Sequence, residues 1–472
     1  MNTSDYRKQA HAFVDWIADY YESVEQYPVK SQVKPREIFD QLPDAAPELG
    51  EPMDVIFDDF KNIVLPGLTH WQHPKFFAYF PSNASYPSLL AEMLMAATSV
   101  QGMIWETSPA STEMEEKVLG WLRDAMGLPK SWNGVIQDTA SSATLAAILS
   151  ARERASGFET NEKGLFGMET FRVYVSSQTH SSIEKDVKIA GIGRANVVKI
   201  GVDDQFSMKP DLLRAAIAKD REQGFTPLCV VATLGTTSST AIDPLRPIAE
   251  ICRDENIWLH VDAAYAGTAL LLPEYRWMID GVDLVDSFVF NPHKWLFTNF
   301  DCSVYYVKEK EVLINTFAIL PEYLRTASHG KVNNYCDWHI QLGRRFRSLK
   351  LWFVLRSFGL EGIRQKLRLH ISLAAELEKQ ITAHPDFELL APRHLNLLCF
   401  RYRPAAITDP NLLNQMNESL LQSINASGKA YLTHTKLNET FTLRLVLGNT
   451  GLEERHVEEV WKLIRETAGQ IR

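Results

Sequence analysis

The chain has 472 residues, 45% of them hydrophobic, which is enough apolar sequence for a large core and about three folding units. The 49 Lys and Arg residues against 58 Asp and Glu residues give a net charge of −9, which does not favour nucleic acid as a partner. The five cysteines form no C-x-x-C pair, so neither a zinc site nor a disulfide framework is expected. Because we find no apolar run typical of a signal peptide or a membrane helix, we expect a cytoplasmic protein without a membrane segment.

Apolar residues recur at three- and four-residue steps between Tyr6 and Val24, which predicts an N-terminal helix that ends before Pro28. Residues 28–75 are rich in proline, so short helices are expected there. Two interpretations stay open for this N-terminal segment. It either packs as an appendage on a larger body or clasps a second subunit.

Further along, short β-branched runs alternate with helical stretches, which predicts a mostly parallel α/β sheet with strands buried on both faces. These runs are 172–176, 196–200, 228–233, 258–262 and 287–291. Ligands bind beyond the carboxyl ends of such strands. The final part combines a helix at 361–383, strand-like runs at 396–402 and 441–447, and a closing helix. We therefore predict three parts: a helical segment 1–85, a large domain 86–360, and a small α+β domain 361–472.

Two of the predicted strands lead into residues with opposite charge. The strand 258–262 ends in Asp262, and the next strand is followed closely by Lys294. Alone, Asp262 is more simply an ion-pair partner or a helix cap. Together, the two residues favour chemistry, because a desolvated lysine can attack a carbonyl group to form an imine. Pyridoxal phosphate is the carbonyl cofactor most often held in this way, with a carboxylate beside its ring nitrogen.

Three other stretches follow predicted strands. Residues 137–142 are small and polar and precede a helix-favouring run, so they are either a plain helix cap or an anion site. Residues 234–240 are rich in hydroxyl groups, but by themselves they indicate a turn. His180 is either a structural histidine or a ring that stacks on the cofactor near the reacting carbon.

Taken together, these blocks resemble the aromatic L-amino acid decarboxylases, a group of pyridoxal-phosphate-dependent (group II) decarboxylases. The resemblance extends in family order over nearly the whole chain. Its most specific blocks are 74–81 (PKFFAYFP), 257–267 (IWLHVDAAYAG), 290–295 (FNPHKW) and 342–350 (LGRRFRSLK). It implies the fold-type I architecture, the N-terminal clasp, and a homodimer with active sites at the interface.

The resemblance also implies roles for single residues. Lys294 carries the imine, Asp262 pairs with the ring nitrogen, His180 stacks over the ring, and Ala264 lies beneath it. Further cofactor contacts are implied for Thr139, Ala140, Ser141, Thr237, Asn291 and His293. The substrate side of the pocket is implied for Trp71, Tyr79, Phe80, Pro81, Ser82 and Met103.

Residues 321–336 have the polar composition of a mobile loop and resemble the family's catalytic lid. Tyr323 matches the tyrosine that protonates the substrate carbon after carbon dioxide leaves. Aldehyde-forming relatives tend to lack either this tyrosine or the histidine matched by His180. The presence of both favours decarboxylation to the amine. Aldehyde synthesis remains the rival chemistry, and a non-enzymatic scaffold would require damage at Lys294, Asp262 or His180, which the sequence does not show.

Three positions depart from the pattern of the animal enzymes. Asp138 brings an acid next to the expected phosphate site, Met103 stands where an aromatic residue is usual, and Ser82 replaces a threonine. These changes leave the preferred substrate open among tryptophan, tyrosine, phenylalanine, their hydroxylated derivatives and histidine.

Overall fold

The computed structural model describes residues 1–319 and 330–471. Tyr323 and most of the predicted lid therefore lie outside the described residues. The chain divides into two compact units. The first comprises Met1–Pro81, Leu373–Leu390 and Leu398–Arg472, and the second comprises Ser82–Ser372 and Ala391–Leu397.

The second unit is built on a seven-stranded sheet with the order β1-β7-β6-β5-β4-β2-β3. Its strands are β1 (Asn133–Gln137), β2 (Phe171–Ser176), β3 (Val197–Ile200), β4 (Thr226–Thr233), β5 (Trp258–Asp262), β6 (Ser287–Phe290) and β7 (Ser303–Val307). Neighbours from β3 to β6 pair in parallel, whereas β7 pairs antiparallel with both β6 and β1. The predicted mostly parallel α/β sheet is confirmed. The sequence analysis did not identify β1 and β7 as strands.

The strand directions decide where the loops meet. Since β7 is antiparallel to both neighbours, β1 runs in the same direction as β6. The carboxyl ends of β1, β2, β4, β5 and β6 therefore lie at one edge of the sheet. All of the cofactor residues expected from the sequence follow one of these strands or end it. This edge is where a ligand site is expected.

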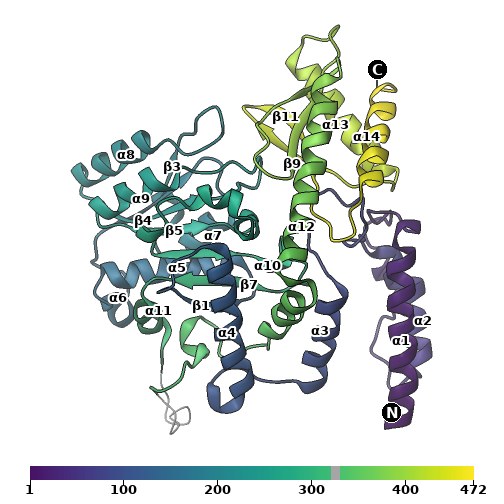
Figure 1. Cartoon of the computed structure of the whole chain (residues 1–472), viewed down its shortest axis with the longest axis horizontal. Helices are drawn as coiled ribbons and strands as arrows, with labels where there is room; N and C mark the ends of the chain where they lie inside the picture. Colours follow the sequence, from purple (N-terminus) through teal and green to yellow (C-terminus); the bar gives the residue numbers. More distant parts are fainter. Residues whose placement is uncertain (320–329, 472) are drawn as a thin grey trace. The chain divides into compact units, whose positions relative to one another are not determined.

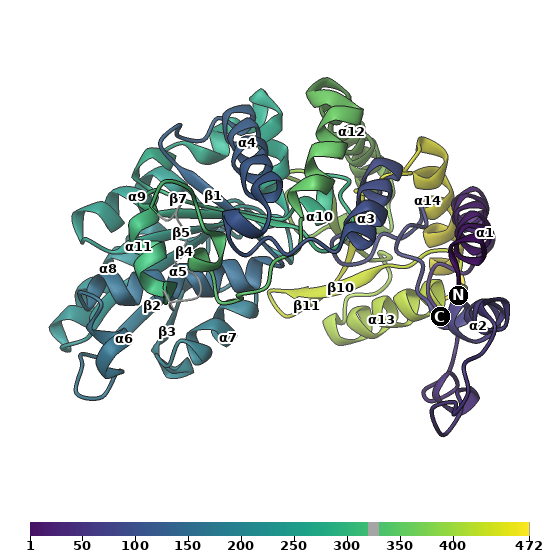
Figure 2. The same ribbon diagram turned by 90° about the horizontal axis from the view of Figure 1, so that it is seen from below.

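Helices cover both faces of this sheet, as Figures 1 and 2 show. One face packs against α5 (Ala140–Ala155), α7 (Ser182–Ile189) and α11 (Lys310–Phe317), with a core that includes Val175, Val231 and Val289. The other face packs against α4 (Pro109–Met126), α8 (Pro210–Glu222) and α9 (Leu245–Asp254). The unit also contains α3 (Tyr86–Thr98), α6 (Glu159–Lys163), α10 (Pro292–Trp295) and much of α12 (Ser348–Ala383). Because strands are covered on both faces, the runs in β5 and β6 are buried throughout, whereas the edge strand β3 is buried only in part.

The first unit combines the two ends of the chain. It holds α1 (Thr3–Ser23), α2 (Met53–Asp59), α13 (Pro410–Ala426) and α14 (Glu454–Ala468). Its four-stranded sheet has the order β10-β11-β9-β8. These strands are β8 (Phe387–Leu389), β9 (Leu397–Tyr402), β10 (Thr433–Leu437) and β11 (Thr440–Val446). The core between this sheet and its helices includes Phe400, Leu443 and Trp461. This confirms the predicted N-terminal helix, the small C-terminal sheet and the closing helix.

Across the described ranges 1–319 and 330–471, no helix combines the length and apolarity needed to cross a membrane.

Candidate active site

Lys294 lies on α10, the short helix that follows β6. Its backbone N–H donates to the Asn291 carbonyl at 2.9 Å, and its own carbonyl accepts the Asn83 Nδ2 donor at 2.6 Å. The next residue, Trp295, stacks on Tyr265 with ring centroids 5.0 Å apart. These contacts fix the backbone of the lysine. Burial lowers the pKa of the Lys294 ammonium, while the negative charge of Asp262 opposes that shift. Burial thus shifts the equilibrium of Lys294 toward the neutral amine, which is the nucleophilic form.

Asp262 ends β5 and is only 7% exposed. Its Oδ1 accepts the Ala264 N–H at 3.0 Å, and its backbone pairs across the sheet with Val289 of β6. The prediction that the strand-end carboxylate meets the lysine at one edge is supported by their electrostatic interaction. A carboxylate so deeply buried requires a positive partner.

His260 lies two residues before Asp262, on the same face of β5. Its ring nitrogens lie 2.9 Å from the Ser287 hydroxyl and 3.2 Å from the Thr144 hydroxyl, which links β6 and α5. Burial lowers the pKa of His260 to about 4, so the ring is neutral near pH 7. His260 therefore supports Asp262 sterically and does not neutralise its charge.

His180 follows β2 and is the third group at this edge. Its Nδ1 accepts the Ser182 backbone N–H at 3.2 Å and lies 2.8 Å from the Ser182 hydroxyl. Because Nδ1 is an acceptor, the neutral ring carries its proton on Nε2. The side chain is exposed to solvent. Desolvation lowers the pKa of His180, Asp262 raises it, and Lys294 lowers it. These opposing effects show that the three side chains share one electrostatic environment.

The N-terminus of α5 has the local geometry expected of an anion site. Thr139 is its N-cap residue, and Ala140 and Ser141 form the first turn, where backbone N–H groups have no partner within the helix. Asp138 occupies one donor at this terminus, because its Oδ1 accepts the Thr139 N–H at 2.6 Å and also the Ser142 hydroxyl. The unusual acid is thus held at the helix terminus by the local backbone.

Asn291 and His293 lie on either side of Pro292, ahead of Lys294. The Asn291 Oδ1 accepts the Ser303 hydroxyl at 2.7 Å, which leaves the amide Nδ2 as its donor. The His293 Nδ1 accepts the Cys302 N–H at 3.0 Å, and burial lowers the pKa of this histidine to about 3. The neutral ring therefore carries its proton on Nε2 and can donate one hydrogen bond to an anion.

Thr237 lies in the loop after β4, and Ala264 follows Asp262 directly. The loop is a tight turn in which the Gly235 and Thr236 N–H groups both donate to the Ala241 carbonyl. Gly235 has a φ of +84°, and a Cβ atom there would lie 2.7 Å from the Ala266 Cβ. Glycine is therefore required by both backbone conformation and space. The turn expected for residues 234–240 is confirmed, and it holds Thr237 at the same sheet edge.

The expected substrate residues fall into different units. Trp71, Tyr79, Phe80 and Pro81 belong to the first unit, where Trp71 stacks on Tyr79 at 6.0 Å and the hydroxyl groups of Tyr79 and Tyr431 lie 3.1 Å apart. Ser82 and Met103 belong to the second unit. Within the first unit, the rings of Trp71 and Tyr79 pack on each other, and both side chains are exposed.

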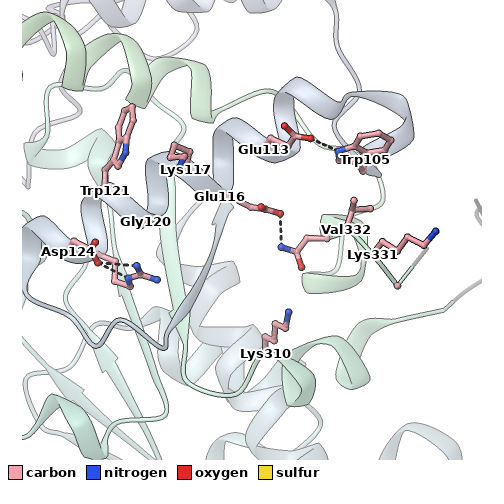
Figure 3. A pocket seen from close by; sticks show the side chains of 13 residues that line it. Trp105, Glu113, Glu116, Lys117, Gly120, Trp121, Asp124, Lys310, Lys331 and Val332 are labelled. Atoms are coloured by element: carbon pink, nitrogen blue, oxygen red, sulfur yellow. Dashed lines mark hydrogen bonds and ion pairs between the residues drawn. The ribbon is translucent and has the colours of Figure 1, made fainter. Parts of the chain in front are cut away.

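A recess of about 810 Å³ lies elsewhere in the second unit, between α4, α11 and residues 330–333 (Figure 3). Its acidic side chains are engaged locally: Glu113 accepts the Trp105 indole N–H at 2.9 Å, and Glu116 accepts the Asn333 amide at 2.7 Å. None of the predicted cofactor or substrate residues lines it. This recess is therefore separate from the candidate active site.

Two residues that shape the site were not predicted from the sequence: Asn83 and His260. Asn83 is 211 positions from Lys294 in the sequence, so no spacing pattern could join them. His260 did carry a signal, since alternate residues of a strand share one face and His260 and Asp262 are such a pair.

The donor set fits pyridoxal phosphate. One sheet edge offers an amine for its aldehyde, a buried carboxylate for its ring nitrogen, and the N-terminus of a 16-residue helix for its phosphate. Fold and donor set together define a pyridoxal-phosphate-dependent enzyme.

Comparison with known proteins gives the family. Residues 35–403 match the pyridoxal-dependent decarboxylase conserved domain, and the chain belongs to this family. It is 43% identical to phenylacetaldehyde synthase of Arabidopsis thaliana, covering all of this chain and 97% of the relative. It is 41% identical to tyrosine decarboxylase of Papaver somniferum, covering all of this chain and 96% of that protein. The crystal structure of Catharanthus roseus tryptophan decarboxylase with L-tryptophan matches with a TM-score of 0.94 at 39% identity, over 100% and 99% of the two chains. The expected family, fold class and cofactor are confirmed.

Proposed function

We propose that this enzyme decarboxylates an aromatic L-amino acid and releases the corresponding amine and carbon dioxide. The observation that carries this proposal is the meeting of Asp262, Lys294 and His180 at one sheet edge. The similarity over the full chain to enzymes named for aromatic amino acids and their products supports the substrate class.

Each residue has a distinct part in this proposal. When bound, pyridoxal phosphate supplies an electron sink for the pair released as the bond to the carboxyl group breaks. Asp262 would hold a proton on the ring nitrogen, which would make the sink effective. Lys294 would provide the amine that holds the aldehyde of the cofactor. His180 would contact the ring, with its proton on Nε2.

The phosphate would be held by two elements. The first turn of α5, which follows the N-cap Thr139, offers the backbone N–H groups of Ala140 and Ser141, and the residues before Lys294 offer the Asn291 amide and the His293 Nε2–H. Thr237 and Ala264 would line the ring. Burial keeps His293 and His260 neutral, so neither histidine adds a positive charge beside the cofactor.

The first test replaces the lysine. We expect Lys294→Ala to fold but to lack the visible absorbance of lysine-bound cofactor, with amine production lost. Lys310→Ala changes a lysine of the separate recess and is the matched control. It should keep both the absorbance of lysine-bound cofactor and the production of amine. An unchanged absorbance spectrum in Lys294→Ala would contradict the proposed site.

We propose Tyr323 as the residue that protonates the substrate carbon after carbon dioxide leaves. Its support is the resemblance of its segment to the family's catalytic lid. Tyr323→Phe should keep cofactor binding but reduce amine output strongly, with aldehyde and hydrogen peroxide appearing in its place. Tyr6→Phe, at an exposed tyrosine of α1, is the control. Unchanged amine output from Tyr323→Phe would remove this residue from the mechanism.

Aldehyde synthesis is the second candidate function, favoured by the 43% identity to phenylacetaldehyde synthase. It consumes oxygen, whereas simple decarboxylation does not. Oxygen uptake by the wild-type enzyme, measured with an oxygen electrode, distinguishes the two reactions. No oxygen uptake during carbon dioxide release supports decarboxylation, and uptake that matches carbon dioxide supports aldehyde synthesis.

We further propose that the substrate side of the pocket is formed by Trp71, Tyr79, Phe80, Pro81, Ser82 and Met103. Aromatic side chains such as Trp71 and Tyr79 suit an indole or phenol ring. The test compares kcat/KM for tryptophan, tyrosine, phenylalanine, their hydroxylated derivatives and histidine, because specificity is a difference in transition-state binding. Trp71→Ala should lower kcat/KM for the preferred aromatic substrate.

We also propose a homodimer with active sites at the interface. In support, α1 has no buried residue, and its Val14 side chain and those of Val55 and Ile56 on α2 are exposed apolar groups. Sedimentation should give twice the chain mass, and Val14→Glu combined with Val55→Glu should shift the protein toward monomer. A monomeric wild-type enzyme with full activity would contradict this.

Finally, we propose a cytoplasmic location. All five cysteines are free thiols, which suits a reducing compartment. Cell fractionation with an antibody against the chain tests this location.

A further inference from the structure

Met103 lies in a segment that forms neither a strand nor a long helix, between α3 and the short helix Trp105–Thr107. Its side chain is half-buried, whereas that of Ile104 beside it is 5% exposed. The backbone of such a segment is positioned by the groups that satisfy its N–H and carbonyl groups. The residues that bind this backbone therefore decide where the Met103 side chain lies.

The backbone of this segment pairs with a second stretch of the chain. The Cys336 N–H donates to the Met103 carbonyl at 2.9 Å, and the Trp105 N–H donates to the Asn334 Oδ1 at 3.1 Å. These two bonds alternate in direction, as they do between antiparallel strands. The Asn334 backbone carbonyl instead accepts the Asp337 N–H at 3.1 Å, so the Asn334 side chain supplies the acceptor opposite Trp105.

The stretch that carries Asn334 is fixed in the core of the second unit. Asn334 is 8% exposed, and Tyr335 and Trp338 are each 1% exposed. The rings of Tyr335 and Trp338 pack at 5.3 Å and belong to the core that includes Val175 and Val231. Asn334 thus presents its side chain from a packed, buried position, which suits a residue that holds another segment in place.

The segment of Met103 is also bound on its other side. The Gly102 N–H donates to the Arg344 carbonyl at 2.9 Å, and the Arg344 N–H donates to the Gln101 Oε1 at 2.5 Å. These bonds precede Met103 in the chain, whereas the bond to Asn334 follows it. Without the Asn334 side chain, the Trp105 N–H would lose this acceptor, and Met103 would be held less firmly on that side.

We propose that Asn334 is a positioning residue for substrate selection, whose side chain holds the segment of Met103 in place. The inference rests on the proposed function and on the proposed placement of Met103 at the substrate side of the pocket. Asn334 acts through Met103 and does not itself touch the substrate. A wall that is free to move accommodates rings of different size more equally, so loss of the Asn334 side chain lowers selectivity.

The test measures kcat/KM of the holoenzyme for the two aromatic L-amino acids of the panel above that the wild type uses best. The ratio of the two values reports selectivity and does not depend on how much of a preparation is folded. Asn334→Ala should lower this ratio about threefold, as expected for the loss of one hydrogen bond. Asn334→Leu keeps the size of the side chain but has no acceptor, so it should lower the ratio as well. An unchanged ratio in either variant would overturn the inference.

Asn333→Ala is the matched control. The Asn333 Nδ2 donates to the Glu116 Oε1 at 2.7 Å, so this neighbouring asparagine binds α4 and not the segment of Met103. Asn333→Ala should keep the wild-type ratio. An equal drop in this variant would assign the effect to any change in this stretch of the chain and would overturn the inference.

A double-mutant cycle tests whether Asn334 acts through Met103. Met103→Ala should change the ratio by itself. Adding Asn334→Ala should then change the ratio no further, because the side chain that Asn334 positions is gone. Effects of the two substitutions that simply multiply would place the action of Asn334 elsewhere and would contradict the inference.

The same measurements separate this inference from the proposals on which it rests. If no aromatic L-amino acid of the panel yields carbon dioxide, the proposed function is wrong. If Met103→Ala keeps the wild-type ratio, the placement of Met103 is wrong, and the inference falls with it. If Met103→Ala changes the ratio while both Asn334 variants keep it, only the inference about Asn334 is wrong.

Discussion

At the scale of single residues, Glu115 and Arg344 form a deeply buried ion pair. Their side chains are 0% and 1% exposed, and the Glu115 Oε1 accepts Arg344 Nη2 at 2.7 Å. The same oxygen accepts the Ile136 N–H at 2.7 Å, so the pair ties α4 to β1. The Arg344 guanidinium also lies over the ring of Tyr335 at 4.7 Å. Removing one partner of such a pair leaves an uncompensated buried charge.

We therefore predict that Glu115→Gln lowers the free energy of unfolding by about 3 kcal/mol. The measurement is urea unfolding of the apoprotein. Asp280→Asn is the control, because Asp280 pairs with Arg246 at the surface, where such pairs contribute about 1 kcal/mol or less. Equal effects of the two substitutions would contradict the prediction.

At the scale of elements, the helical turns Ala266–Leu271 pack closely on the end of β6. A Cβ atom at Gly267 would lie 2.4 Å from the Phe290 Cβ, and Phe290 is the last residue of β6. Because α10, which carries Lys294, follows β6 closely, a displacement of the end of β6 would also move Lys294.

Gly267→Ala should lower the free energy of unfolding by about 1 to 3 kcal/mol through overpacking and should weaken cofactor binding. Gly120→Ala is the control, since a Cβ at this position in α4 meets nothing within 4 Å and alanine favours helix by about 1 kcal/mol. Urea unfolding and cofactor titration check both variants. A Gly267→Ala enzyme with unchanged stability and affinity would show that this contact is loose.

The elements also show what the sequence could and could not predict. Asp262, Lys294 and His180 could be placed together, because parallel strands bring their carboxyl ends to one edge. The strand β7 was missed although its run of Val304, Tyr305 and Tyr306 is typical of strands. Contacts such as Glu115 with Arg344 could not be predicted, because they join positions 229 apart through packing alone.

At the scale of the whole molecule, buried titratable groups set the response to acid. Burial lowers the pKa of His73 and His260 to about 4 and of His293 and His339 to about 3. Burial is also the main cause that raises the pKa of Asp186 to about 7 and of Asp243 to about 6. The histidines are neutral in the folded state and protonate on unfolding below pH 6.5, whereas the aspartates lose their protons.

Between pH 5 and 6, these six groups take up about four protons and release about two on unfolding, a net uptake of about two. Together they therefore contribute a loss of stability of about 2.7 kcal/mol per pH unit as the pH falls. Urea unfolding of the apoprotein at pH 5.0, 5.5 and 6.0 measures this slope. In Asp186→Asn the net uptake becomes three, so its slope should be steeper. A slope of zero or of opposite sign in the wild type would contradict this prediction.

The make-up of the first unit has a consequence for how the chain folds during synthesis. The Phe77 N–H donates to the Tyr431 carbonyl at 2.9 Å, and the Val446 N–H donates to the Phe77 carbonyl at 3.0 Å. Phe77, made early by the ribosome, thus finds these backbone partners more than 350 positions later. Until the last strands emerge, its buried side chain, which belongs to the core of this unit, stays uncovered. A nascent chain in this state is a natural client for chaperones acting at the ribosome exit.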